Sequence, residues 1–313
     1  MIYTITLNPA IDKILFLDEF QRSRTNRLTR TLETIGGKGT HVSINLKLQA
    51  VQSTALGIAL GENGKKIVKL MDAWGVQVQF LHYALAGKES RTNYAIVENT
   101  GHICSMLTER GPILPASITS DLLNQVRGLL NAGDMLVLTG DASNVVDTTI
   151  YSRLTLVAQE LGAKVFLDAS GNYLKEGLKS GPFLIKPNFE ELCFIADRDL
   201  KTEAEIVSAM LNLDRFNIPM IAMTWGRNGA IVKNRQDFFR VNPIKVDAVN
   251  ESGCGDAFLS AIITGIENNM TIEETLKSAA AVAAAAAESE STVGFEPDRV
   301  AHLKELAVVV KIH

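Results

Sequence analysis

The sequence predicts an α/β protein with a largely parallel central sheet. From Gln52 onward, short β-rich apolar runs alternate with amphipathic helical patterns, which is typical of a sheet covered by helices on both faces. Most of the predicted strands end in a polar or glycine-containing turn, and ligands of open α/β sheets bind beyond the carboxyl ends of the strands. The length of 313 residues and the hydrophobic content of 46% allow one large domain or two smaller ones.

The elements follow from the apolar runs and the helical patterns in chain order. The first strand is expected at residues 2–7, and it ends at Asn8-Pro9. Further buried strands are expected at residues 53–59, 135–139, 165–168, 183–186 and 220–224. Helices are expected at residues 64–74, 119–131, 148–161, 203–214, 255–268 and 272–288.

Two stretches interrupt the alternation of strands and helices. Residues 14–34 and residues 89–109 both resemble consecutive antiparallel strands, and the second contains a turn at Asn99-Thr100-Gly101. They predict a small separate sheet. Because the chain contains no Pro/Ser-rich linker and no internal repeat, we expect a single domain over residues 1–313, in which this sheet is inserted as a lid.

Composition and charge exclude several classes of protein. With 31 Lys+Arg against 35 Asp+Glu, the formal net charge is -4, which argues against binding of nucleic acid or of anionic membranes. The three cysteines are far apart and form no CxxC pair, so neither a zinc site nor a redox couple is expected. Residues 1–8 lack the features of a secretory signal, and the apolar run at residues 279–287 is too short to span a bilayer. We therefore expect a cytoplasmic protein.

The strongest local signal is the turn Gly253-Cys254-Gly255-Asp256, which leads directly into an amphipathic helix. Such a turn exposes backbone N–H groups at the positive end of a helix, where an anion is stabilised. A carboxylate at Asp256 could accept the proton of a substrate hydroxyl while the N–H groups stabilise charge on a transferred phosphoryl group. The alternative is an ordinary glycine-rich loop with an aspartate at a helix start.

A second glycine turn, Gly36-Gly37-Lys38-Gly39, also precedes a helical pattern. Its glycines allow the backbone to approach a ligand closely, and the lysine supplies a positive charge. An ordinary tight turn is the alternative. The Walker A spacing is absent, and the first strand is not followed by GxGxxG, which argues against a dinucleotide-binding Rossmann unit.

These motifs resemble those of the ribokinase-like, or PfkB, carbohydrate kinases over essentially the whole chain. The opening Asn8-Pro9-Ala10-Ile11-Asp12 resembles that family's first strand with its sugar-binding aspartate, and the two glycine turns resemble its two signatures. The resemblance implies a three-layer αβα sandwich with a mostly parallel central sheet and a small β-sheet lid. It also implies ATP as phosphoryl donor, Mg²⁺ as cofactor, Asp256 as catalytic base, and Gly253, Cys254 and Gly255 as anion hole.

The same resemblance assigns residues to the nucleotide and the metal. Asn188 and Glu191 match an NxxE motif that would hold Mg²⁺, largely through water. Adenine would lie against the alanine-rich residues 279–287, for which close helix–sheet packing is the alternative reading. The remaining residues on the phosphate and nucleotide side would be Asp168 with Ser170 and Gly171, then Thr224, Gly226 and Gly229.

Within the family, the chain resembles the phosphosugar branch, which contains 1-phosphofructokinase and tagatose-6-phosphate kinase. The opening Asn-Pro-Ala-Ile-Asp, Ser90-Arg91-Thr92-Asn93, Gly111-Pro112 and Asn250 carry this resemblance. Arg91 would bind the phosphate already present on the sugar, a task that suits a guanidinium fork. A solvent-facing cation on a surface strand is the alternative for Arg91. The other substrate-binding residues would be Asp12, Gly37, Lys38 and His41.

Three departures from the family pattern affect the site. His41 stands where the family usually has Asn, which leaves its role open. Asp141-Ala142-Ser143-Asn144 replaces the usual Ser-Leu-Pro-Pro-Gly, which could alter the substrate pocket. Cys254 replaces the more common Ala or Ser, and a thiol at a helix N-terminus can have a lowered pKa, although a tolerated small residue is the simpler interpretation.

The resulting prediction is an ATP-dependent kinase that converts a ketohexose phosphate to a 1,6-bisphosphate. Fructose 1-phosphate and tagatose 6-phosphate are both open as acceptors. A kinase of a neutral sugar or nucleoside is the first alternative, and a non-catalytic sensor of sugar phosphate or nucleotide is the second. By the same resemblance, two copies of the chain could pair through the lid.

Overall fold

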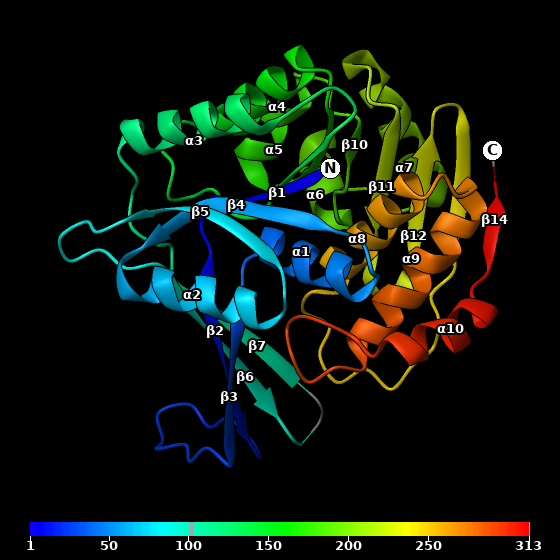
Figure 1. Cartoon of the computed structure of the whole chain (residues 1–313). Coiled ribbons are helices and arrows are strands. Elements are labelled where there is room, and N and C mark those ends of the chain that lie inside the picture. Colours follow the sequence, from blue (N-terminus) through cyan, green and yellow to red (C-terminus); the bar gives the residue numbers. More distant parts are fainter. Residues whose placement is uncertain (101–102, 313) are drawn as a thin grey trace.

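A ten-stranded sheet forms the centre of the computed structural model, which describes residues 1–100 and 103–312 (Figure 1). Its strand order is β14-β13-β12-β11-β10-β9-β8-β1-β4-β5, and the strands from β11 to β5 in that order pair in parallel. The strands are β1 (Ile2–Thr6), β4 (Ser53–Leu60), β5 (Gln77–Tyr83), β8 (Met135–Thr139), β9 (Lys164–Asp168), β10 (Leu184–Ile185), β11 (Met220–Thr224), β12 (Ala230–Asn234), β13 (Asp237–Val241) and β14 (Val309–Lys311).

The strand order reverses at β1, which lies between β4 and β8. After β1 the chain adds β4 and β5 on one side, and it then returns to add β8 through β11 on the other. Thr6 at the end of β1 pairs with Thr139 at the end of β8. In an open α/β sheet, the crevice beyond such a switch point is where ligands bind.

Helices cover both faces of this sheet and give two separate cores. Leu122, Leu154 and Leu192 belong to the core on one face, while Val42 and Leu259 belong to the core on the other. The first face carries α3 (Ala116–Leu129), α4 (Ile150–Glu160), α5 (Gly171–Leu178), α6 (Phe189–Ala196) and α7 (Glu203–Leu211), and the second carries α1 (Lys38–Leu48), α2 (Gly61–Ala73), α8 (Cys254–Glu267), α9 (Ile272–Ala287) and α10 (Pro297–Leu306). This is the three-layer αβα sandwich expected from the sequence.

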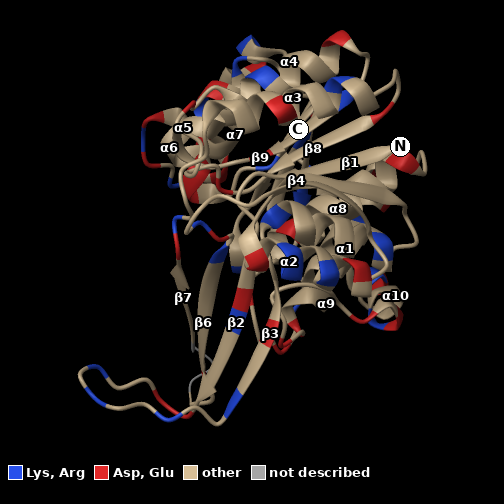
Figure 2. Cartoon of the chain, turned by 60° about the vertical axis from the view of Figure 1, so that its left-hand side comes forward, with Lys and Arg blue, Asp and Glu red and all other residues tan. Residues whose placement is uncertain are grey.

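A second sheet of four strands extends away from the body of the molecule (Figure 2). Its order is β3-β2-β6-β7, with the strands β2 (Ala10–Leu17), β3 (Arg30–Gly36), β6 (Arg91–Glu98) and β7 (Ile103–Thr108). The pairs β2–β3 and β6–β7 are antiparallel, as expected, and β2 pairs with β6 in parallel. Part of the turn expected at Asn99-Thr100-Gly101 lies outside the described residues.

The structure confirms the small sheet but corrects where it begins. The first strand of the sheet starts at Ala10 and not near residue 14, because its pairing with β3 and β6 already begins at Ala10, opposite Gly36 and Arg91. Asp12 is therefore part of this sheet. Among the described residues, no helix is long and apolar enough to cross a membrane.

Candidate active site

A cavity of about 410 Å³ lies where the small sheet meets the carboxyl ends of β1 and β8. The starts of α1 and α8 border it as well, so elements far apart in the sequence contribute side chains. Its lining contains residues of both glycine turns that stood out in the sequence, namely Gly37 and Lys38 of the first and Gly253 and Asp256 of the second, whereas Cys254 and Gly255 do not line it. The lining residues are Thr6, Asn8, Asp12, Gly37, Lys38, His41, Arg91, Asn93, Met106, Thr108, Gly140, Asp141, Ser252, Gly253, Asp256 and Thr292.

Asp256 lies in the first turn of α8 and is 5% exposed. The first N–H groups of a helix have no partner within the helix, so the start of α8 presents donors and a partial positive charge toward the cavity. The Oδ2 atom of Asp256 lies 2.9 Å from Nδ1 of His41. A carboxylate at this position can take a proton from a hydroxyl, and the neighbouring N–H groups can stabilise an anion.

Gly253 is the N-cap residue of α8, and its φ of 81° is in the left-handed region. A Cβ atom at this position would lie 2.1 Å from the carbonyl oxygen of Thr292. Both the backbone conformation and the space therefore require glycine here. Gly37 is the N-cap residue of α1 and has a φ of 111°, so both helices that border the cavity begin at a glycine with a positive φ.

Asp12 is held by two side chains that the sequence did not single out as its partners. Asn93 on β6 donates to Oδ1 over 2.8 Å, and Thr292 donates to Oδ2 over 3.1 Å. Asp12 is 3% exposed. A Cβ atom on Gly36 would collide with this carboxylate at 2.0 Å, so the first glycine turn also makes room for Asp12.

Arg91 is buried at the edge of the same cavity. Its Nε donates to the carbonyl oxygen of Asn8 over 3.1 Å, and its Nη1 donates to the carbonyl oxygen of Glu109 over 3.0 Å and to Asp141 over 3.1 Å. The interpretation as a solvent-facing strand cation is wrong, because the side chain is 9% exposed. No bond within the described residues engages its Nη2, which leaves that nitrogen available to an anionic ligand.

Asp168 joins two lysines beneath the cavity. Its carboxylate is fully buried at the end of β9, 2.9 Å from Nζ of Lys38 and 3.1 Å from Nζ of Lys186. Burial alone would raise the pKa of Asp168, but the two ammonium groups outweigh it and lower the pKa below its usual value. Conversely, burial would lower the pKa of Lys38, and the charges of Asp168, Asp256 and Glu191 raise it instead.

Lys186 was not among the site residues expected from the sequence. Its Nζ would lie 3.3 Å from a Cβ atom placed on Gly255, so this lysine reaches the glycine turn at the start of α8. The only local signal was its position directly before Pro187-Asn188 in a motif assigned to the metal. The structure thus brings an additional positive charge next to the expected anion hole.

Asn188 and Glu191 form a capping box at the start of α6. The Oδ1 atom of Asn188 accepts from the backbone N–H of Glu191 over 2.7 Å, and Oε2 of Glu191 accepts from the N–H of Asn188 over 2.8 Å. Burial raises the pKa of Glu191, an effect that Lys38 opposes and Asp168 reinforces. Among the described residues no cluster of three or more metal-ligating side chains is present.

These contacts fit a hydrated magnesium ion better than a directly ligated one. The capping box occupies Oδ1 of Asn188 and Oε2 of Glu191, which leaves Oε1 of the glutamate. Mg²⁺ commonly keeps several waters and takes only one or two carboxylates from the protein. Glu191 therefore suits the expected role through water.

Thr224, Gly226 and Gly229 lie outside the lining of the cavity. Thr224 ends β11 and forms a bridge with Asn188, which links this segment to the start of α6. Gly226 and Gly229 have φ values of 50° and 81° in the turn before β12. Their assignment to the nucleotide side stays a prediction.

The alanine-rich part of α9 is mostly buried. Ala279, Ala281 and Ala285 belong to the core that α9 shares with α8, and their exposed fractions are 0%, 0% and 3%. The close-packing reading of these alanines therefore accounts for the buried positions. The contact with adenine stays a prediction.

Cys254 does not have the reactive thiol considered from the sequence. Burial raises the pKa of the Cys254 thiol to about 12, and the nearby charges of Glu251 and Asp256 reinforce the effect. The positive end of α8 does not overcome these influences. The raised pKa does not support a reactive thiol, and it agrees with the simpler interpretation of Cys254 as a tolerated small residue.

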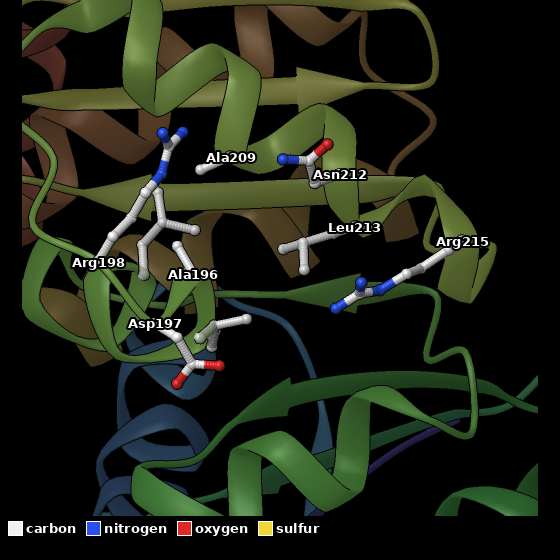
Figure 3. A pocket seen from close by; sticks show the side chains of 9 residues that line it. Ala196, Asp197, Arg198, Ala209, Asn212, Leu213 and Arg215 are labelled. Atoms are coloured by element: carbon white, nitrogen blue, oxygen red, sulfur yellow. The ribbon is translucent and has the colours of Figure 1, made fainter.

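A larger depression of about 520 Å³ lies elsewhere on the surface (Figure 3). It is formed by α6, α7 and the short 3-10 helix η1 (Asn212–Phe216). Figure 3 shows Arg198 and Arg215 beside it. None of the expected site residues lines this depression, so the larger volume does not make it the candidate active site.

Comparison with known proteins gives one family. The model described as "pfkB family carbohydrate kinase" matches residues 5–299, a segment that contains all of the expected site residues. Tagatose-6-phosphate kinases from two strains of Staphylococcus epidermidis are each 29% identical over 315 aligned residues, with 100% of both chains covered.

Solved structures share the fold of this chain. Phosphofructokinase-2 from Escherichia coli in complex with potassium has a TM-score of 0.90 and 23% identity, with 97% of this chain and 98% of that chain covered. A possible 1-phosphofructokinase from Thermotoga maritima has a TM-score of 0.88 and 23% identity, with 100% and 99% covered. At these identities the two structures establish the arrangement of the elements.

Proposed function

The chain belongs to the pfkB family of carbohydrate kinases, and from this premise we propose that it transfers the γ-phosphoryl group of ATP to a hydroxyl of a ketohexose phosphate. The product is a ketohexose 1,6-bisphosphate, and the acceptor is fructose 1-phosphate or tagatose 6-phosphate. The observation that carries the proposal is that Asp256 and Arg91 line one cavity. The full-length similarity to tagatose-6-phosphate kinases supports a phosphorylated acceptor.

Asp256 is the base in the proposed reaction. The acceptor hydroxyl gives its proton to this carboxylate as its oxygen forms a bond to the γ-phosphorus, and the bond from that phosphorus to the bridging oxygen of ADP breaks. The protein positions the acceptor through Asp12 and Arg91. Both side chains are held by neighbouring polar groups, so little ordering is needed when the acceptor binds.

Positive groups stabilise the phosphoryl group during transfer. The start of α8 borders the cavity at Gly253 and Asp256, and its first N–H groups have no partner within the helix. The ammonium groups of Lys38 and Lys186 are held nearby by the buried Asp168. Such preorganised donors act where negative charge develops in the transition state. Mg²⁺ held through water by Glu191 and Asn188 would neutralise further charge on the nucleotide phosphates.

A coupled assay of ADP release over a panel of sugars and sugar phosphates tests the proposed function. Turnover is expected with fructose 1-phosphate or tagatose 6-phosphate and not with the matching unphosphorylated sugars, because Arg91 would then have no phosphate to bind. Efficient turnover of a neutral sugar or a nucleoside would favour the first alternative. Tight binding without ADP release would favour a sensor.

Arg91→Ala is expected to raise the KM for the phosphosugar about thirtyfold, which corresponds to roughly 2 kcal/mol for one charge-assisted contact. The KM for ATP should change far less, because in the proposed assignment the guanidinium binds the phosphate of the acceptor and not the nucleotide. Steady-state kinetics with each substrate varied in turn provides the measurement.

The Arg91→Ala variant also loses bonds to Asn8 and Glu109, so its folding must be controlled. Arg91→Lys keeps a positive charge without the fork and should give an intermediate KM. A similar increase in KM for both substrates, in a variant that melts near the wild type, would contradict the assignment of Arg91.

We further propose that the small sheet acts as a lid that closes over the bound acceptor and excludes water. Asp12 on β2 and Arg91 on β6 belong to this sheet and line the cavity, so an acceptor would contact the sheet and the main body together. Hydrogen exchange in β2 and β6 should slow when ATP analogue and acceptor are both bound. Unchanged exchange in these strands would contradict closure.

Pairing of two copies through the same sheet is also a proposal. The edge strand β7 carries exposed Met106 and Leu107, and an exposed apolar edge strand is a common place for association. Light scattering on the purified protein and on Leu107→Glu would show whether this edge is used. A monomer in the wild-type protein would exclude it.

A further inference from the structure

His41 and Asp256 are 215 residues apart in the sequence and form a buried pair in the structure. His41 lies in the first turns of α1 and is 6% exposed. Its Nδ1 atom is 2.9 Å from Oδ2 of Asp256, and its Nε2 atom is 3.0 Å from the carbonyl oxygen of Ile35. Both nitrogens of the ring therefore contact the protein, so neither is free for the sugar contact expected from the sequence.

The partners of the ring determine where its protons lie. A carbonyl oxygen can only accept a hydrogen bond, so Nε2 of His41 carries a proton and donates it to Ile35. A neutral ring would then present the lone pair of Nδ1 to the carboxylate of Asp256, which is repulsive. The short contact is attractive when a second proton lies between Nδ1 and Oδ2, which makes the pair an imidazolium and a carboxylate.

The charged groups around the ring favour the imidazolium. Burial alone would lower the pKa of His41, but the bond to Asp256, the charges of Asp256 and Asp12, and the carbonyl of Ile35 outweigh it and raise the pKa. On its own helix the charged residue closest in sequence is Lys38, whose ammonium group is paired with Asp168.

The other charges at the cavity compensate each other. Arg91 on β6 is paired with Asp141, which follows β8. Asp256 on α8 and Asp12 on β2 therefore remain the dominant charges that raise the pKa of His41.

We propose that His41 is a positioning residue for the catalytic base: its imidazolium holds Oδ2 of Asp256, so that Oδ1 faces the acceptor hydroxyl. This inference rests on the proposed kinase reaction and adds a residue to it. The hydrogen bond fixes the rotation of the carboxylate, which would otherwise be free to turn toward Lys38. The ring borders the cavity, but both of its nitrogens are bonded to the protein, so its loss is expected to affect kcat more than either KM.

Because His41 titrates, kcat is expected to fall at alkaline pH. When the pH rises above the pKa of His41 in the folded protein, Nδ1 loses its proton and its lone pair repels Oδ2 of Asp256. The carboxylate then leaves its productive orientation and kcat falls. The same pair stabilises the fold fully below the ordinary histidine pKa, and this contribution is lost as the pH rises through the raised value.

Two amide variants separate the two contacts of the ring. In His41→Asn the amide occupies the place of Nδ1 and can still donate to Asp256, whereas in His41→Gln it occupies the place of Nε2 and can still donate to Ile35. The Gln variant should lose kcat roughly tenfold with nearly unchanged KM values, because a misplaced reacting group costs at least this much. The Asn variant should keep most of its kcat.

The pH profiles of kcat provide a second comparison. The wild type should lose kcat at alkaline pH, and His41→Asn should not, because an amide does not titrate. Equal losses of kcat in the Gln and Asn variants, or an alkaline limb shared by the wild type and His41→Asn, would overturn the proposal. Thermal melting at each pH controls for folding.

A measurement on the protein without substrates keeps this inference separate from the proposed function. Nitrogen NMR of the imidazoles, followed through a pH titration, should show one ring, absent from both variants, that keeps protons on both nitrogens to a higher pH than an ordinary histidine does. A His41 ring that becomes neutral at or below the ordinary histidine pKa would overturn the proposal even if turnover is observed. A doubly protonated ring in a protein that turns over no sugar or sugar phosphate would instead indicate that the proposed function has failed while the pair is real.

Discussion

Asp256→Asn is expected to lower kcat by about 10²- to 10⁴-fold, the range that general base catalysis contributes. Asparagine has nearly the same shape as aspartate and remains acceptable in the first turn of α8. Its amide can also keep a hydrogen bond to His41, so the buried pair need not collapse. What the variant loses is the capacity to take the proton of the acceptor hydroxyl.

Steady-state kinetics on Asp256→Asn provides the measurement, with the KM for ATP expected to change little. Asp298→Asn is a matched control, because Asp298 lies in the first turn of α10 and is exposed. The control should keep kcat and melting temperature near those of the wild type. A near-normal kcat in Asp256→Asn would remove Asp256 as the base and with it the proposed mechanism.

Several central strands and the starts of α7, α8 and α9 could be predicted closely because their signals are local. Strands such as β8 and β11 are continuous apolar runs, and their predicted bounds agree with the structure. The hairpin of β12 and β13 was not predicted. Its turn contains Arg235 with a φ of 56°, a conformation that glycine or asparagine usually marks, so no turn signal was present in the sequence.

The sequence singled out several residues that the structure brings to one cavity, but it did not reveal the partners of these residues. Asp12 was identified by its motif, yet its contacts with Asn93 and Thr292 arise from strand pairing and from a segment 280 residues away. The pair of His41 and Asp256 likewise depends on the packing of α1 against α8. Sequence spacing carries no information about contacts of this kind, because the fold creates them.

Gly253→Ala, at the start of α8, should lower kcat by about 10²-fold or more. Displacement of catalytic groups by roughly 1 Å has an effect of this size. The residue has a φ of 81°, and a new Cβ atom would lie 2.1 Å from the carbonyl oxygen of Thr292. A backbone atom cannot turn away as a flexible side chain can, so the start of α8 must move. The N–H groups and Asp256 would move with it.

The substitution should also raise the KM for the acceptor, since Thr292 donates a hydrogen bond to Asp12. Gly87→Ala is the matched control, because Gly87 has a φ of 66° and no heavy atom within 4 Å of the added Cβ position. In both variants alanine in the left-handed region costs roughly 1–2 kcal/mol of backbone strain. Only in Gly253→Ala does the new Cβ atom also collide with the backbone of Thr292. If backbone strain alone mattered, the two variants would lose stability equally and keep their kcat. Kinetics and melting of both variants distinguish these outcomes, and a kcat within threefold of the wild type in a folded Gly253→Ala would show that the start of α8 is not the anion site.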